Sequence, residues 1–164
     1  MNKLKKINDL KVIVEKERKK GRKVVFANGC FDILHVGHIR YLKEAKELGD
    51  MLIVAINSDS SAKKLKGNGR PVTPENERAE IVAAIEYVDY VTIFNEPDVS
   101  SLLLTLKPDI HAKGTDYTEN SVPEVDTVRA YGGSVAITGD KKERSSTNLI
   151  SNIKSQISKL RNEF

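Results

Sequence analysis

The stretch KVVFANGCFDILHVGHIRYLKEAKELGDMLIVAIN, residues 23–57, carries a complete strand, helix and strand pattern. Short apolar runs at 23–28 and 51–57 are typical of buried strands. Residues 37–48 lie between them, and their apolar side chains recur at helical spacing: Ile39, Leu42, Ala45 and Leu48. Gly49 follows where a helix ends. We therefore predict a βαβ unit with two parallel strands.

The rest of the chain repeats this alternation. We expect an N-terminal helix ending near Gly21, helices at 73–87, 99–106, 123–131 and 146–162, and strands at 90–94, around His111 and at 134–138. Alternating strands and helices predict an α/β fold, a Rossmann-like open parallel five-stranded sheet with helices on both faces. We expect one domain over 1–164, with an N-terminal helix (1–21), a catalytic core (22–153) and the end of a C-terminal helix (154–164).

Composition narrows the function classes. The 164 residues suit one domain, and their apolar stretches are far shorter than the ~20 residues that cross a bilayer. The N-terminus lacks the apolar segment of a signal peptide. Cys30 is the single cysteine, so no intramolecular disulfide can form. We expect a cytoplasmic protein with no membrane segment.

The net charge of +4 suits an anionic partner, either nucleic acid or a phosphorylated metabolite. Much of the positive charge lies in residues 1–23 at helical spacing, as on the solvated face of an amphipathic helix. Aromatic residues make up 5% of the chain and Trp is absent, so it lacks the stacking platform of single-strand binders. We expect a small phosphorylated substrate and no nucleic acid.

Ligands of open parallel sheets bind beyond the carboxyl ends of the strands. Three segments fall there: 28–38, 113–117 and 143–148. In the first, His35 and His38 flank a predicted helix start, where N–H groups and the helix dipole favour phosphate. Imidazoles can donate to phosphate oxygens whose charge grows in a transition state.

Zinc is the competing interpretation of these histidines. A zinc site needs three or four ligands. The only other histidine is His111, and the remaining possible ligands are Cys30 and carboxylates scattered along the sequence. We therefore predict no protein metal site and expect Mg²⁺ to arrive with a nucleotide triphosphate. A lone histidine is more often structural, but His-x-Gly-His in a strand-to-helix turn favours catalysis.

The sequence resembles the HxGH nucleotidyltransferases, most closely the adenylyltransferase domain of bacterial ADP-heptose synthase, which acts on D-glycero-beta-D-manno-heptose 1-phosphate. Five segments carry the resemblance: NGCFDILHVGH (28–38), LGDMLIVAINSD (48–59), LKGNGRPVTPENER (65–78), KPDIHAKGTDY (107–117) and SSTNLI (145–150). The resemblance implies a Rossmann-like fold and an enzyme that transfers AMP from ATP to a heptose 1-phosphate. The products would be pyrophosphate and ADP-heptose, a lipopolysaccharide precursor.

The resemblance also implies residue roles. It assigns catalysis to His35, His38 and Lys66, although Lys63 or Lys64 could replace Lys66 in the loop predicted at 58–73, which we expect to be mobile until the triphosphate binds. It assigns nucleotide binding to Asn28, Gly29, Cys30, Phe31, Asp32, Gly37, Lys113, Gly114, Asp116, Ser145, Ser146 and Thr147.

Several of these residues have structural alternatives. Asp32 could orient the acceptor phosphate or a Mg²⁺-bound water, or cap its own turn. Ser145 could cap a helix as well as bind phosphate. Gly29 and Gly37 would let a nucleotide approach the backbone. Arg70 and Arg78 are assigned to substrate phosphate, but Arg78 lies inside a predicted helix, where a structural ion pair is a rival interpretation.

Two departures from the relatives matter. The alternative function is a cytidylyltransferase acting on glycerol 3-phosphate or another alcohol phosphate. Glycerol-phosphate cytidylyltransferases carry an arginine in an RTEGIS-like segment, where this chain has DKKER (140–144), and this difference weakens that alternative. A non-catalytic nucleotide-binding module is a third possibility, which the intact His35 and His38 oppose. Many ADP-heptose synthases carry a sugar kinase domain, so we expect a separate kinase upstream, and a homodimer.

Overall fold

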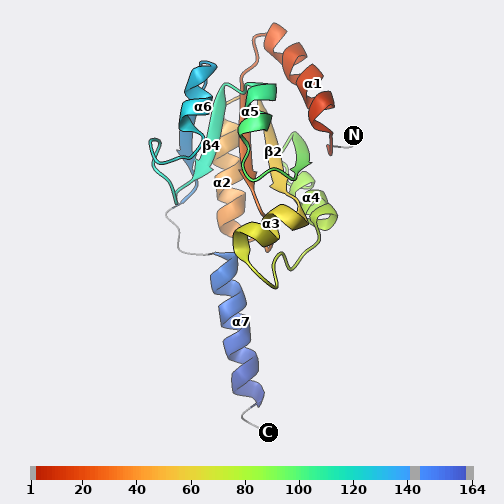
Figure 1. The fold of residues 1–164 in the computed structure, drawn as a ribbon, viewed down its shortest axis with the longest axis vertical. Helices are drawn as coiled ribbons and strands as arrows, with labels where there is room; N and C mark the ends of the chain where they lie inside the picture. The colour runs from red at the N-terminus through yellow and green to blue at the C-terminus, as the bar shows by residue number, and fades with distance from the viewer. Residues whose placement is uncertain (1–2, 141–144, 162–164) are drawn as a thin grey trace.

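The computed structural model describes residues 3–140 and 145–161, which form a parallel sheet layered between helices (Figure 1). The elements in chain order are α1 (Ile7–Lys19), β1 (Val24–Gly29), α2 (Val36–Glu47), β2 (Met51–Asn57), α3 (Asp59–Lys66), α4 (Glu75–Ala83), β3 (Tyr90–Phe94), α5 (Ser100–Leu106), β4 (Ile110–Gly114), α6 (Val125–Ala130), β5 (Ser134–Thr138) and α7 (Ser146–Arg161).

All five strands are parallel, in the order β3-β2-β1-β4-β5, which confirms the predicted sheet. β1 lies at the centre: all six of its residues pair with β2 on one side, and three of them pair with β4 on the other. The chain leaves β1 toward β2 and β3, and then returns to the opposite side for β4 and β5. This reversal between β1 and β4 opens a crevice at the carboxyl ends of these two strands.

The two faces of the sheet bury separate cores, because alternate strand residues point to opposite sides. Val25 and Ala27 of β1 face α2 and α4, whereas Val24 and Phe26 face α1, α5 and α6. Each of these four side chains is fully buried. The prediction of helices on both faces is therefore confirmed.

An aspartate immediately precedes three of the strands and clamps the neighbouring chain. Asp109, before β4, donates its backbone N–H to the Val24 carbonyl at 2.9 Å and accepts the Val24 N–H on Oδ2 at 2.7 Å. Asp50 forms the same pair with Lys23, and Asp89 with Leu52. These carboxylates satisfy amide groups at the start of the sheet that no strand residue reaches.

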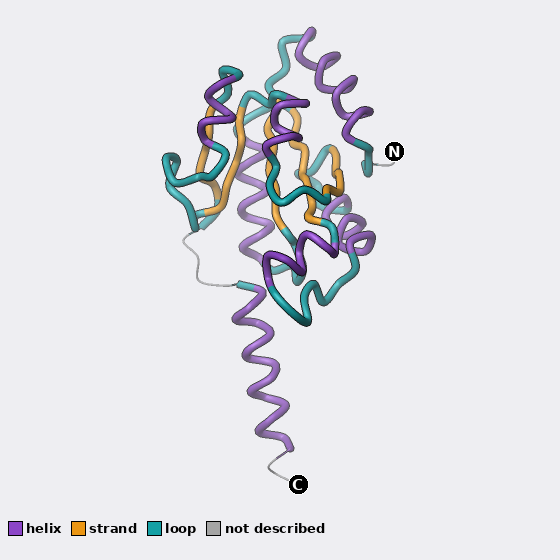
Figure 2. The backbone as a smooth tube through the Cα atoms, viewed as in Figure 1, coloured by secondary structure: helices purple, strands orange, loops and turns teal. Residues whose placement is uncertain are grey.

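The segment after β2 differs from the prediction. Residues 58–73 are not one loop, because residues 59–66 form α3 (Figure 2). Ser58 Oγ accepts the Ser61 N–H at 3.2 Å and caps this helix, while Ser61 and Ala62 are buried against the body of the protein. The following helix, α4, ends at Ala83 rather than near residue 87.

The C-terminal helix α7 extends away from the sheet (Figures 1 and 2). Ile153 and Ile157 on it are 52% and 47% exposed, so this part of the helix contributes little to either core. Within residues 3–140 and 145–161, no helix has both the length and the apolar character needed to cross a membrane.

The aspartate clamps lead to a stability prediction. Asp109→Ala leaves the Val24 N–H at the start of the central strand without its acceptor, so the free energy of unfolding should fall by about 1–3 kcal/mol. Urea denaturation followed by circular dichroism measures the change. Asp126→Ala, at an exposed position on α6, is the matched control. Equal losses for the two variants would contradict the clamp.

Candidate active site

A cavity of about 530 Å³ lies at the carboxyl ends of β1 and β4, where the strand order reverses. Its size suits a nucleotide or sugar phosphate. Every site residue predicted from the sequence except Arg78 lines it: Asn28, Gly29, Cys30, Phe31, Asp32, His35, Gly37, His38, Lys66, Arg70, Lys113, Gly114, Asp116, Ser145, Ser146 and Thr147. Residues from four separate segments of the chain thus converge on one crevice.

The turn between β1 and α2 is built around the Phe31 ring. Phe31 has a φ of 48°, a backbone conformation that residues other than glycine rarely adopt. Its ring is buried, and the ring centroid lies 5.4 Å from that of His38 and 6.5 Å from that of Tyr41. A Cβ on Gly29 would lie 3.1 Å from the Phe31 ring. A Cβ on Gly37 would lie 3.0 Å from the His35 ring. Both glycines therefore make room for the protein's own rings.

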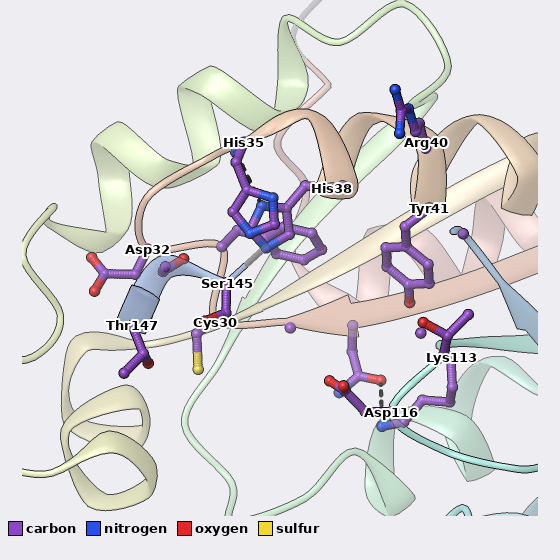
Figure 3. Close-up of a pocket in the computed structure, with 18 of the residues that line it drawn as sticks. Cys30, Asp32, His35, His38, Arg40, Tyr41, Lys113, Asp116, Ser145 and Thr147 are labelled. Atoms are coloured by element: carbon purple, nitrogen blue, oxygen red, sulfur yellow. Dashed lines mark hydrogen bonds between the residues drawn. The ribbon is translucent and has the colours of Figure 1, made fainter. Parts of the chain in front are cut away.

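The two histidine rings lie side by side at the start of α2, with centroids 4.0 Å apart (Figure 3). The His35 backbone N–H donates to His38 Nδ1 at 3.3 Å, so Nδ1 is an acceptor and the proton of a neutral His38 ring sits on Nε2. His35 is the N-cap of α2, so both rings share the end of the helix where partial positive charge gathers. This end can donate hydrogen bonds to an anion.

Residues 145–147, at the start of α7, line another side of the cavity. Ser145 Oγ accepts the Asn148 N–H at 3.1 Å, so the predicted capping role of Ser145 is confirmed. Ser146 Oγ donates to the Ile33 carbonyl at 2.9 Å and ties α7 to the turn that carries the histidines. Thr147 is exposed and lines the cavity.

The end of β4 supplies the far side of the cavity. Lys113 is only 7% exposed, and its Nζ lies 3.3 Å from Asn28 Oδ1 and 5.0 Å from the centre of the Tyr117 ring. Burial lowers the pKa of Lys113, and the nearby Glu124 opposes that change. A Cβ on Gly114 would meet no atom within 4 Å, which leaves open space beside Asp116.

Asp32 holds the segment after α3 in place. Its carboxylate accepts hydrogen bonds from Arg70 Nε, from the Val72 N–H at 2.7 Å and from the Thr73 N–H at 3.0 Å. Burial alone would raise the pKa of Asp32, but the bonds from Thr73, Arg70 and Val72 lower it. The alternative that Asp32 caps its own turn is wrong, because its three partners lie about 40 positions away along the chain.

The assignment of Arg78 to substrate phosphate is corrected by its burial. The side chain is 0% exposed and is not part of the cavity lining. Its guanidinium donates to the Cys30 carbonyl, to the Thr73 carbonyl at 2.9 Å and to Asp59 Oδ1 at 2.8 Å. The rival interpretation, a structural ion pair, is the one observed. Arg78 therefore joins the turn after β1 to the two ends of the segment between β2 and α4.

Three lysines on α3 were candidates for contact with the triphosphate. Lys66 lines the main cavity, whereas Lys63 and Lys64 are not part of its lining. Cys30 also lines the cavity, and its Sγ lies 3.7 Å from Asn57 Oδ1. Burial raises the pKa of the Cys30 thiol, which disfavours a nucleophilic thiolate.

Sequence reasoning missed several cavity residues: Arg40, Tyr41, Asn57, Thr138, Gly139 and Asp140. Tyr41 follows His38 by three positions on the same helix, which places the two on one face. Asn57 and Gly139 lie at the ends of β2 and β5, so the rule that ligands bind beyond carboxyl ends finds them when it is applied to every strand.

Comparisons with known proteins agree with the fold. Residues 26–154 match the cytidylyltransferase-like family. The chain is 48% identical over 151 residues to the bifunctional protein HldE of Geobacter metallireducens, covering 92% of this chain and 31% of that protein. HldE of Campylobacter fetus is 50% identical over 134 residues, covering 82% and 28%. The chain thus spans less than a third of the length of these relatives.

Two solved structures share the fold. The lipopolysaccharide core biosynthesis protein of Thermoplasma volcanium has a TM-score of 0.61 and 37% identity, covering 71% of this chain and 94% of that one. A pantoate-beta-alanine ligase of Francisella tularensis, in complex with beta-gamma ATP and beta-alanine, has a TM-score of 0.60 and 18% identity, covering 89% of this chain and 69% of that one. The ligase supports the fold alone.

The buried position of Arg78 predicts that its substitution affects folding directly. Arg78→Lys keeps the charge but cannot reach three separate acceptors, so without any ligand the free energy of unfolding should fall by about 1–3 kcal/mol. Chemical denaturation of the two proteins measures the difference. Arg129→Lys, at an exposed position, should change stability by no more than about 0.5 kcal/mol. Unchanged stability of Arg78→Lys together with weakened substrate binding would restore the phosphate-binding role.

Proposed function

Because the chain belongs to the cytidylyltransferase-like family of nucleotidyltransferases, we propose that it transfers AMP from ATP to a heptose 1-phosphate and releases pyrophosphate. The observation that carries the proposal is the pair of adjacent imidazoles at the N-terminus of α2, inside the crevice between β1 and β4. Such an arrangement stabilises phosphate charge without any covalent intermediate.

The choice of substrate rests on the relatives. Proteins named HldE are 44–50% identical to this chain, and a protein of lipopolysaccharide core biosynthesis is 37% identical over nearly its whole length. Both agree with the resemblance to the adenylyltransferase domain of ADP-heptose synthase. The segment that separates this chain from glycerol-phosphate cytidylyltransferases, DKKER, has residues 141–144 outside the described part of the chain.

In the proposed reaction an oxygen of the sugar phosphate attacks the α-phosphorus of ATP in line with the leaving pyrophosphate. One P–O bond forms as the bond to the bridging oxygen breaks, and pyrophosphate takes the electron pair. His38 Nε2–H and the N–H groups at the start of α2 donate to the oxygens that gain charge. Lys66 adds a flexible positive charge beside the triphosphate.

The proposal includes Mg²⁺ bound to the triphosphate. In the described part of the chain, no three side chains of His, Cys, Asp or Glu lie close enough to hold a metal ion. Mg²⁺ is commonly bound through substrate phosphates with few protein ligands, so this donor set fits an ion carried by ATP. When bound there, it would neutralise part of the charge on the leaving pyrophosphate.

The proposed setting follows from the chemistry. A cytoplasmic location supplies ATP, and a separate sugar kinase would supply the heptose 1-phosphate. We also propose that the enzyme acts as a homodimer. The alternative substrate pair is CTP with glycerol 3-phosphate or another alcohol phosphate, in keeping with the description of the family.

The histidine pair leads to the first test. His38→Ala should lower turnover by at least ~100-fold, as expected for the loss of one donor to the transition state. His35→Ala should have a similar effect. Release of pyrophosphate under saturating substrates measures the rate. Lys43→Ala, at an exposed position on the same helix and outside the cavity lining, should keep wild-type turnover, and thermal melts must match for all three variants. Wild-type turnover in a folded histidine variant would remove the central claim.

A second test concerns the nucleotide. ATP and CTP are supplied together with Mg²⁺ and heptose 1-phosphate, and the nucleotide sugars are separated and identified. ADP-heptose should predominate, because a site built around one base leaves polar groups unpaired when it holds the other. An excess of the CDP-linked sugar would overturn the choice of ATP. Product with glycerol 3-phosphate but with no sugar phosphate would favour the alternative function.

A further inference from the structure

A continuous set of polar groups, three of them buried, runs from the start of α6 to half-buried Asn28 at the end of β1. Glu124, 5% exposed, places Oε2 3.6 Å from Lys113 Nζ, and this ammonium lies 3.3 Å from Asn28 Oδ1 (dashed line at Lys113 in Figure 3). His111, fully buried, places Nε2 3.0 Å from the same Asn28 oxygen. Of these four residues, only Asn28 and Lys113 line the cavity.

The ammonium fixes which way the Asn28 amide faces. Lys113 can only donate, so the amide atom next to it must be the oxygen rather than the NH₂ group. The same oxygen faces His111, so His111 Nε2 must carry the proton that it donates. Burial, together with the charge of Lys113, lowers the pKa of His111 to about 3, so this ring is neutral. Both donors therefore hold the amide in a single orientation.

The NH₂ group of Asn28 is left for a ligand. Asn28 Nδ2 donates to no other residue of the described chain, and Asn28 lines the cavity. We propose that Glu124, Lys113 and His111 are positioning residues, which hold the Asn28 NH₂ group as a hydrogen-bond donor to a negatively charged oxygen of the bound substrate. The adjacent ammonium favours such an oxygen over a neutral one. The inference deepens the proposed function and rests on it.

Glu124 is the member of this set that can be tested through pH. The groups that face Lys113 are Glu124, the Tyr117 ring and His111, with Asp116 at the same end of the cavity (Figure 3). Burial lowers the pKa of Lys113, and Glu124 raises it. Removal of the Glu124 charge lowers this pKa further, so the ammonium is lost at a lower pH. A neutral amine no longer dictates the orientation of Asn28.

The experiment compares Glu124→Gln with Glu119→Gln, an exposed control on the same connection. KM is measured for Mg-ATP, Mg-CTP and heptose 1-phosphate between about pH 6.5 and 9.5. This range lies below the usual lysine pKa of about 10.4, where a lysine whose pKa is lowered loses its proton. With Glu124→Gln, KM for one substrate should rise roughly tenfold at the alkaline end, as for a lost bond to a charged group, while kcat changes less. The substrate affected identifies whose oxygen Asn28 contacts.

A rescue separates positioning from general structural damage. Arginine does not titrate in this range, so Glu124→Gln combined with Lys113→Arg should show a KM that does not vary with pH. Asn28→Asp replaces the donor with a carboxylate and should raise the same KM at every pH. A KM profile of Glu124→Gln that matches Glu119→Gln, or an increase independent of pH, overturns the proposal.

The binding of nucleotide by the wild-type protein, measured by calorimetry, keeps the two proposals apart. A wild type that binds neither Mg-ATP nor Mg-CTP contradicts the proposed function, and the inference falls with it. A wild type that binds one of them, while Glu124→Gln binds it equally well at alkaline pH, contradicts the inference alone.

Discussion

The reversal of strand order between β1 and β4 is the constraint on which the site depends. A parallel sheet brings all its carboxyl ends to one edge, and the reversal separates the connections there, which leaves a crevice. The helix that follows β1 must then begin beside this crevice, with its N–H groups directed to it. The start of α2 is therefore suited to bind an anion, and we propose that the two histidines add donors there.

The role proposed for the histidines requires a rigid turn, and bonds from buried polar groups fix the turn that carries them. Arg78 holds the Cys30 carbonyl, Asp32 holds the segment at 70–73, and Ser146 holds the Ile33 carbonyl. Each bond joins segments far apart in the sequence. Donors fixed in advance cost no reorganisation when charge develops, which is the physical basis of this type of catalysis. Charged residues in this fold therefore hold the turn in place, in addition to those proposed to bind the ligand.

Sequence reasoning succeeded where a local pattern determines the structure. The strands at 51–57, 90–94 and 134–138 match their predicted bounds, because buried apolar runs need no information from elsewhere in the chain. It failed for α3, whose residues are mostly polar and show no apolar stripe; a serine cap and two small buried residues stabilise that helix instead. It also failed for Arg78, since three acceptors from separate segments surround its guanidinium, and no spacing along the chain reveals them.

Sequence alone also does not separate structural from ligand-binding residues within the segment at 28–38. Of the residues in NGCFDILHVGH, Gly29, Phe31 and Asp32 pack or clamp the turn, while the rings of His35 and His38 lie together at the cavity. The motif is thus a mixture of residues that shape the turn and residues that can touch a phosphate. A substitution anywhere in it can abolish activity, so loss of activity alone does not identify a catalytic residue. The distinction requires the burial and the bonding partners of each side chain, which only the folded structure provides.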